Sequence, residues 1–164
     1  LWYLKYWDIT IVLLTPRINQ FYWLFSLAKF KKLIDFMDIN FITLLNGPQK
    51  VAPFSHAVRA GNYLFITGQM PTLKSDSSKL ISSVIEEQTH QVMKNLIDVL
   101  KGSGSSIDKV IFSRVYLVNF ADFDRMNKVY ATYFDKNKLP ARTCIGVTGL
   151  AVGASVEIDF IAGI

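Results

Sequence analysis

The sequence has few of the residues that mark several common kinds of site. Cysteine occurs once, at Cys144, and histidine twice, so no internal disulfide can form and no metal-ligand spacing is visible. A single cysteine suits a reducing compartment. No run of apolar residues free of charge reaches the length of about 18 that a membrane span needs. The net charge is +5, but the basic residues are scattered and form no stripe typical of a nucleic-acid surface.

Glycine is absent from residues 1–46, and all nine glycines lie at or beyond Gly47. The same segment holds all three tryptophans. This shift in composition predicts an N-terminal extension over 1–46 and a domain over 47–164. We expect the extension to be poorly ordered; a targeting segment and a membrane-binding helix over 25–36 are the second and third interpretations. The sequence begins with Leu rather than Met, so we expect it to be either a fragment or the product of an uncertain gene start.

The domain shows strand and helix patterns in the order β-β-α-β-α-β-β. A hairpin is expected over 54–69, followed by a polar loop over 71–83. Ser83 and Glu86 have the spacing of a capping box, which predicts that the first helix begins there. The second helix begins at 121–122, and the strand between the helices covers 110–118. The pattern predicts a two-layer α+β domain with both helices on one sheet face, so a partner subunit is expected on the other.

The pattern of Leu139–Ile164 is typical of two strands, and alternation sorts the side chains of each strand onto two faces. The polar set is Arg142 and Cys144 in the first strand and Glu157 and Asp159 in the second. The apolar set is Thr143, Ile145, Val147, Val156, Ile158 and Phe160. We expect the two strands to be neighbours in the sheet, so that the apolar set lies under the helices and Arg142 and Glu157 share the polar face. That face is either a solvated ion pair or a site for a small anion and a water.

Other arrangements for chemistry are weaker. Ser55 and His56 are adjacent, so on a strand they point to opposite faces and cannot act together. Cys144 has no neighbouring base, which favours a small buried residue rather than a nucleophile. A glutamate shielded from water can have a raised pKa and activate a water molecule. The residues alone therefore give one candidate reaction, hydrolysis of a small molecule that carries a carboxylate, with Arg142 and Glu157 at the site, although their spacing by itself favours a solvated ion pair.

Five segments, in order and spacing, resemble the RidA/YjgF family of reactive-intermediate deaminases, also called L-PSP endoribonucleases. They are APFSHA (52–57), FITGQMP (65–71), ADFDRMNKVY (121–130), PARTC (140–144) and VEID (156–159). The resemblance implies a chorismate-mutase-like α+β fold with a mixed sheet, assembled as a homotrimer with pockets at the subunit interfaces. It also implies hydrolysis of 2-iminobutanoate, 2-iminopropanoate or 2-aminoacrylate to 2-keto acids and ammonia, with no metal and no bound cofactor.

The resemblance further implies roles for individual residues. Arg142 would bind the substrate carboxylate, and Glu157 would position the attacking water and transfer protons. The substrate-binding residues would be Phe54, Thr67, Gly68, Asn127 and Cys144, with Gly68 and Cys144 acting through their backbones. Phe54 stands where many members have tyrosine, so one hydroxyl is missing.

The sequence leaves two alternatives to a deaminase. One is an endoribonuclease or translation inhibitor of the L-PSP type, which the family's other name suggests. The other is a non-catalytic trimer that binds a small ligand, which only Phe54 favours. The expected location is the cytoplasm, with the mitochondrion as the alternative. The expected partner is a small imine, enamine or 2-keto acid; no integral membrane span is expected, and a nucleic-acid partner is not expected.

Overall fold

The computed structural model describes residues 3–6, 9–12 and 38–164, and the chain divides into two compact units, 1–37 and 38–164. In the first unit, β1 pairs antiparallel with β2; their bounds are Tyr3–Tyr6 and Ile9–Val12. The helix predicted over 25–36 lies outside the described residues. The second unit begins nine residues before the boundary that composition predicts, because the strand β3 (Ile39–Ile42) pairs with its sheet.

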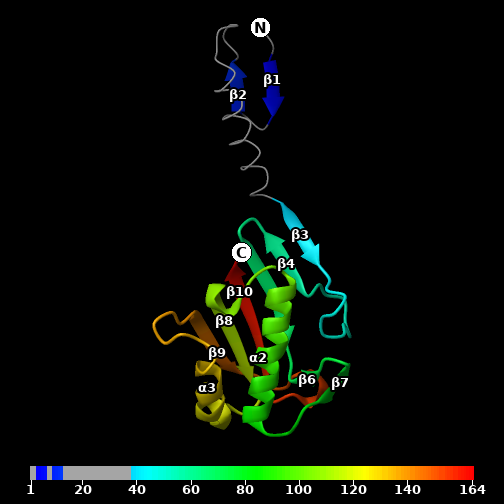
Figure 1. Ribbon diagram of the computed structural model, residues 1–164, viewed down its shortest axis with the longest axis vertical. Coiled ribbons are helices and arrows are strands. Elements are labelled where there is room, and N and C mark those ends of the chain that lie inside the picture. The colour runs from blue at the N-terminus through cyan, green and yellow to red at the C-terminus, as the bar shows by residue number, and fades with distance from the viewer. Residues whose placement is uncertain (1–2, 7–8, 13–37) are drawn as a thin grey trace. The chain divides into compact units, whose positions relative to one another are not determined.

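The second unit is built on a six-stranded sheet with the order β3-β4-β5-β10-β8-β9 (Figure 1). The strands after β3 are β4 (Ala57–Ala60), β5 (Tyr63–Gln69), β8 (Val110–Leu117), β9 (Ala141–Gly146) and β10 (Val156–Gly163). All neighbours are antiparallel except β8 and β9, which are parallel. The predicted mixed sheet is therefore confirmed. The segment predicted as a polar loop instead holds a small hairpin of β6 (Thr72–Leu73) and β7 (Asp76–Leu80).

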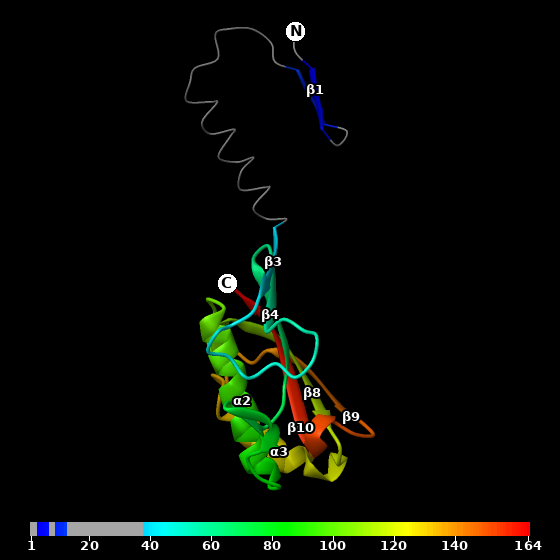
Figure 2. The same cartoon turned by 90° about the vertical axis from the view of Figure 1, so that its right-hand side faces the viewer.

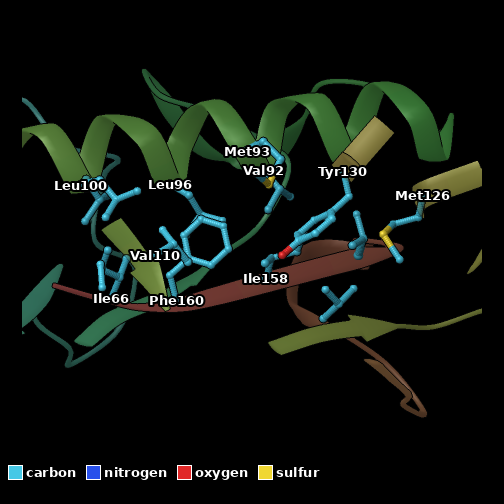
Figure 3. Close-up of a cluster of buried hydrophobic side chains, with 14 of the residues drawn as sticks. Ile66, Val92, Met93, Leu96, Leu100, Val110, Met126, Tyr130, Ile158 and Phe160 are labelled. Carbon is cyan, nitrogen blue, oxygen red and sulfur yellow. The ribbon is translucent and has the colours of Figure 1, made fainter. Parts of the chain in front are cut away.

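Two helices, α2 (Ile85–Gly102) and α3 (Phe123–Ala131), lie on the same side of the sheet, as predicted (Figures 1 and 2). Apolar residues at helical spacing along α2 pack on the sheet, and Figure 3 shows this cluster. Its fully buried members include Val92, Met93, Leu96, Leu100, Val115, Ile158 and Phe160. Short 3-10 helices precede β8, α3 and β10; they are η1 (Ile107–Lys109), η2 (Phe120–Asp122) and η3 (Ala151–Gly153).

The capping box predicted at Ser83 is wrong. The residue that caps α2 is Val84, and no side chain caps the helix. Ser82 organises this end instead: its hydroxyl accepts from the Val84 N–H at 3.0 Å, and its carbonyl accepts from the Gln88 side chain at 2.8 Å. The helix therefore begins later than the capping-box spacing indicates, because the preceding turn satisfies these polar groups.

A row of apolar side chains crosses the sheet face that points away from the helices. Register aligns five residues in this row, which are Phe41, Val58, Phe65, Ile161 and Phe112. Phe41 is 69% exposed and Phe65 is 45% exposed. Within 38–164 no helix covers this face (Figure 2). Burial of such a row would be favourable, which keeps open the expectation of a partner on this side.

The turn before β10 contains a strained valine. Val152 has φ 53° and ψ 17°, in the left-handed region that a β-branched residue rarely occupies. Its side chain is 40% exposed.

We expect Val152→Asn to stabilise the folded chain by about 1 kcal/mol, because asparagine tolerates this conformation. Thermal unfolding would show a rise in Tm of about 3–6 °C. Ala151→Asn, at an exposed neighbour without positive φ, is the control; an unchanged Tm for Val152→Asn would contradict the prediction.

Candidate active site

Arg142 extends from the edge strand β9 toward α3. Its Nη1 donates to Asn127 Oδ1 at 2.6 Å, and its Cζ lies 4.9 Å from the ring centroid of Tyr130 and 5.8 Å from that of Phe123. We call these four residues the arginine cluster. Three of them, Arg142, Asn127 and Tyr130, border a cavity of about 730 Å³; its other lining residues are Asp124, Lys128, Ala131, Leu139 and Pro140. Two predicted site residues, Arg142 and Asn127, thus lie together.

Glu157 lies on β10 against Gly68 of β5. A Cβ atom at Gly68 would overlap the Glu157 carboxylate, so only glycine leaves room for this side chain where it stands. Burial raises the pKa of Glu157, and the nearby charge of Asp159 raises it further. A carboxyl group with a raised pKa exchanges its proton closer to neutral pH, which suits acid–base work.

Asp159 is the buried charge that acts on Glu157. Arg114 Nε donates to both of its carboxylate oxygens, at 2.9 and 3.0 Å, and the Tyr116 hydroxyl donates at 3.2 Å. These three hydrogen bonds pair the Asp159 carboxylate, which is only 6% exposed. A fixed negative charge therefore stands beside Glu157, and it disfavours a second negative charge there.

The approach of Gly68 to Glu157 depends on a bulge between β5 and β10. The register shifts so that Gln69 pairs with Ile158 and Ile66 pairs with Phe160. The buried Gln69 side chain donates to the carbonyls of Thr67 and Gly68 at 3.0 and 3.3 Å. We call Glu157, Gly68, Thr67 and Gln69 the glutamate cluster. The sequence analysis did not select Gln69, whose only signal was an amide at the end of a largely apolar strand.

The Thr67 hydroxyl has a partner inside the fold. It donates to the carbonyl oxygen of Ser55 at 2.6 Å, and the Thr67 N–H donates to the His56 carbonyl at 3.2 Å. His56 itself is buried, and its ring forms hydrogen bonds with the Leu44 N–H through Nδ1 and with the Pro48 carbonyl through Nε2. These bonds hold the segment that carries the half-buried Phe54 beside β5.

Cys144 is half-buried on β9, packed against the hydrophobic core. Burial raises the pKa of its thiol, and the charge of Arg142 opposes that rise. A protonated thiol is a poor nucleophile, which agrees with the interpretation of Cys144 as a packing residue. Its predicted contact with substrate is through the backbone, which this state of the thiol does not affect.

The prediction that Arg142 and Glu157 share one sheet face is wrong. The strands that carry them are not neighbours, because β8 lies between β9 and β10. Register through β8 aligns Arg142 with Ser113 and Phe160, which are buried on the helix side. It aligns Glu157 with Tyr116 and Ile145. Ile145 was predicted to lie under the helices, but it is 46% exposed and lies on the other face. The arginine and glutamate clusters therefore lie on opposite faces of the sheet.

Glu157→Gln is expected to change how the stability of the chain depends on pH. The folded chain keeps the Glu157 proton over a range where the unfolded chain has released it, since the folded pKa is raised. The contribution of Glu157 to stability therefore decreases as pH rises from 4.5, the ordinary value, through the raised folded value. The amide that replaces the carboxyl group does not titrate, so the variant should gain stability relative to the natural chain across that window and show a constant difference below it.

Urea unfolding of both proteins between pH 4 and 8 measures this difference. The lowered pKa values of Asp76 and Glu86, which come from hydrogen bonds to Ser78 and Arg125, are common to both proteins and cancel. A stability difference that stays the same at every pH would contradict a raised pKa at Glu157.

Among the residues that the structure describes, no three side chains of His, Cys, Asp or Glu converge as metal ligands would. No helix among these residues is both long and apolar enough to cross a bilayer.

Comparison with known proteins gives consistent matches. Residues 45–164 match the family model described as Endoribonuclease L-PSP. A RutC family protein of Pyrococcus horikoshii is 40% identical over 117 residues, which cover 71% of this chain and 91% of that protein. Reactive Intermediate Deaminase A, chloroplastic, of Arabidopsis thaliana is 36% identical over 115 residues, 70% of this chain and 60% of that protein.

Solved structures agree with the α+β fold class. The crystal structure of a Rid family protein, YyfA of Yersinia pestis, superposes with a TM-score of 0.73 at 34% identity, over 77% of this chain and 100% of that one. It shares the arrangement of a mixed sheet with two helices on one face. These matches confirm the resemblance carried by the motifs: the chain belongs to the Endoribonuclease L-PSP family, also called RidA/YjgF.

Proposed function

We propose that this chain is an imine/enamine deaminase that hydrolyses 2-iminobutanoate- or 2-iminopropanoate-type intermediates, such as those from 2-aminoacrylate, to 2-keto acids and ammonia. The observation that carries the proposal is Arg142, a guanidinium held by Asn127 beside an open cavity. A planar guanidinium binds a carboxylate through two parallel hydrogen bonds. Glu157, with its raised pKa, supplies the acid–base group. The family membership and the related Arabidopsis deaminase support the same reaction class.

The separation of the two clusters bears on how the site is assembled. A small imine bound to Arg142 cannot reach Glu157 of the same chain, because the sheet lies between them. A second copy of the chain can bring its glutamate cluster to the arginine cluster of the first. The exposed apolar row on the sheet face supports such an association. We propose a homotrimer with shared sites, and light scattering on the full chain would test that number of subunits.

The proposed mechanism needs only these residues and water. Arg142 binds the substrate carboxylate and orients the adjacent C=N carbon toward the water. Glu157 accepts a proton from the water as the water oxygen bonds to that carbon, and returns it to the nitrogen, which gives a carbinolamine. The hydroxyl proton of the carbinolamine then passes through Glu157 to the nitrogen while the C–N bond breaks and the C=O bond forms, so ammonia and the 2-keto acid leave. Backbone groups of Gly68 and Cys144 are proposed to contact the water or the nitrogen.

The test is release of ammonia and pyruvate from 2-aminoacrylate that a serine or threonine dehydratase generates in situ. Addition of this protein should accelerate release and reduce the fraction of imine that semicarbazide traps. No acceleration by a folded assembly, both for the natural chain and for Phe54→Tyr, would reject the deaminase. Tight binding of a carboxylate without turnover would then favour a ligand-binding trimer.

A second candidate function is RNA cleavage, which only the family description favours. The scattered basic residues do not support it. Ribonuclease activity that co-purifies with the protein and disappears in Arg142→Ala would establish it. The same activity in that variant would indicate a contaminating nuclease.

We propose that the activity takes place in the cytoplasm. The single cysteine, with a thiol pKa that burial raises, suits a reducing environment. Fractionation of cells that express the natural gene would test this, and recovery with mitochondria would contradict it.

A further inference from the structure

One face of α3 is arranged around Arg142. Phe123, Asn127 and Tyr130 stand at positions i, i+4 and i+7 of the helix, which places them on the same face. All three approach the guanidinium: Asn127 through a hydrogen bond of 2.6 Å, Tyr130 and Phe123 through their rings at 4.9 and 5.8 Å. The guanidinium therefore has one hydrogen-bonded N–H group and two aromatic rings at cation–π distance.

This arrangement divides the surface of the guanidinium between two uses. An aromatic ring attracts a cation through the face of the ring and does not use the N–H groups of the cation as a hydrogen-bond acceptor would. Asn127 takes one N–H of Nη1. Within residues 38–164 no acceptor contacts Nε or Nη2, so an in-plane pair of donors stays available. A carboxylate needs such a pair for bidentate binding.

The ring of Tyr130, not its hydroxyl, is the part that meets Arg142. The residue is 5% exposed and sits among apolar side chains of the core, as Figure 3 shows. Its hydroxyl forms no hydrogen bond of good geometry; the neighbouring hydroxyl of Ser113, which also has none, opposes the rise in the pKa of Tyr130 that burial causes. Burial raises the pKa of Tyr130, so the ring stays neutral while it faces the cation. What Tyr130 offers to Arg142 is therefore the face of its ring.

We propose that Tyr130 is a positioning residue for Arg142, assisted by Phe123: the rings hold the guanidinium plane so that its free N–H pair is presented to a carboxylate in the cavity. This inference rests on the proposed function in one respect, the binding of a carboxylate by Arg142. It assigns to the aromatic face of α3 a role in affinity, separate from its role in the core.

The test compares Tyr130→Leu with Tyr130→Phe in the full chain, using pyruvate as the probe in calorimetric titrations. Tyr130→Phe keeps the ring and should bind pyruvate within about threefold of the natural chain. Tyr130→Leu removes the ring and should raise the Kd about tenfold, the size expected for a desolvated cation–π contact. In turnover the same variant should raise KM about tenfold and change kcat by less than about threefold.

A double-mutant cycle separates positioning from general damage to the core. In an Arg142→Ala background, Tyr130→Leu should have no further effect on the Kd for pyruvate. If Tyr130→Leu does not fold, Phe123→Leu, at a half-buried position, replaces it, with an expected rise in Kd of about threefold. An unchanged Kd in a folded ring-deletion variant, or an equal loss in both backgrounds, would overturn the inference.

The outcomes also distinguish this inference from the proposed function. If the natural chain binds pyruvate through Arg142 but does not hydrolyse the imine, the deaminase proposal fails and the positioning role stands. If it hydrolyses the imine and the ring-deletion variant behaves like the natural chain, only the positioning role fails. No binding of pyruvate by the natural chain would overturn the positioning role directly.

Discussion

Arg142→Ala is expected to lower kcat/KM for a carboxylate-bearing imine by about 100-fold or more, without preventing assembly. Loss of one partner from a hydrogen-bonded charge pair typically costs about 2–5 kcal/mol of binding free energy, and each 1.4 kcal/mol corresponds to about tenfold. The effect should be mostly on substrates with a carboxylate, because Arg142 acts on that group. Steady-state rates of 2-keto acid release measure it.

Two control variants sharpen this prediction. Arg142→Lys keeps the charge but has no planar fork, so it should recover only part of the lost rate. Arg59→Ala removes an exposed arginine whose Nε donates to the Gly61 carbonyl, away from both clusters, and should leave the rate unchanged. Wild-type kcat/KM in Arg142→Ala, with the subunit number unchanged, would show that the assigned role of Arg142 is wrong.

Gly68→Ala is expected to lower kcat by about 100-fold while the chain stays folded. The added Cβ would occupy the position of the Glu157 carboxylate, so that side chain must rotate away. The displaced atoms are the end of a flexible side chain, and the loss of stability should stay near 1 kcal/mol. Misplacement of a catalytic group by about 1 Å can lower a rate about 100-fold. Turnover and urea unfolding, measured together, test both parts.

Comparison with a second glycine and with Glu157 itself isolates the cause. Gly149→Ala, at a position where an added Cβ meets no atom within 4 Å, should leave turnover unchanged. In a Glu157→Gln background, Gly68→Ala should lower the rate little further, because both changes remove the same group. Full activity of Gly68→Ala would mean that the carboxylate need not occupy this position.

The sequence was sufficient for those elements whose signal is local. The stripe of α3 follows from helical spacing, so it predicts that Phe123 and Tyr130 share a face, and PARTC identifies Arg142. Glycine predicts that the first helix stops at Gly102 or Gly104; α2 ends at Gly102, and Gly104, with φ 83°, follows the C-cap residue Ser103. Parallel pairing of β8 with β9 agrees with the helix between them, a connection that such strands need.

Which faces of β9 and β10 lie on the same side of the sheet could not be predicted in the same way. Alternation tells which residues of one strand share a face, but β8, which is distant in sequence, decides which face of β10 matches that of β9. The short strand β3 was not predicted, because the domain boundary at 47 was placed from composition. The strand character of β3 depends instead on its hydrogen bonds to β4. Gln69 was missed because a bulge leaves no periodic signal.

The placement of Arg142 and Glu157 on opposite faces has a genetic consequence. If each site takes one residue from each of two copies, a subunit that lacks Arg142 and a subunit that lacks Glu157 are inactive for different reasons, and each still carries the half that the other lacks. Refolded together in equal amounts, they should regain about a quarter of the natural sites, since each half is intact in half of the copies. In a cell with two alleles, each inactive alone, the two defects would complement one another.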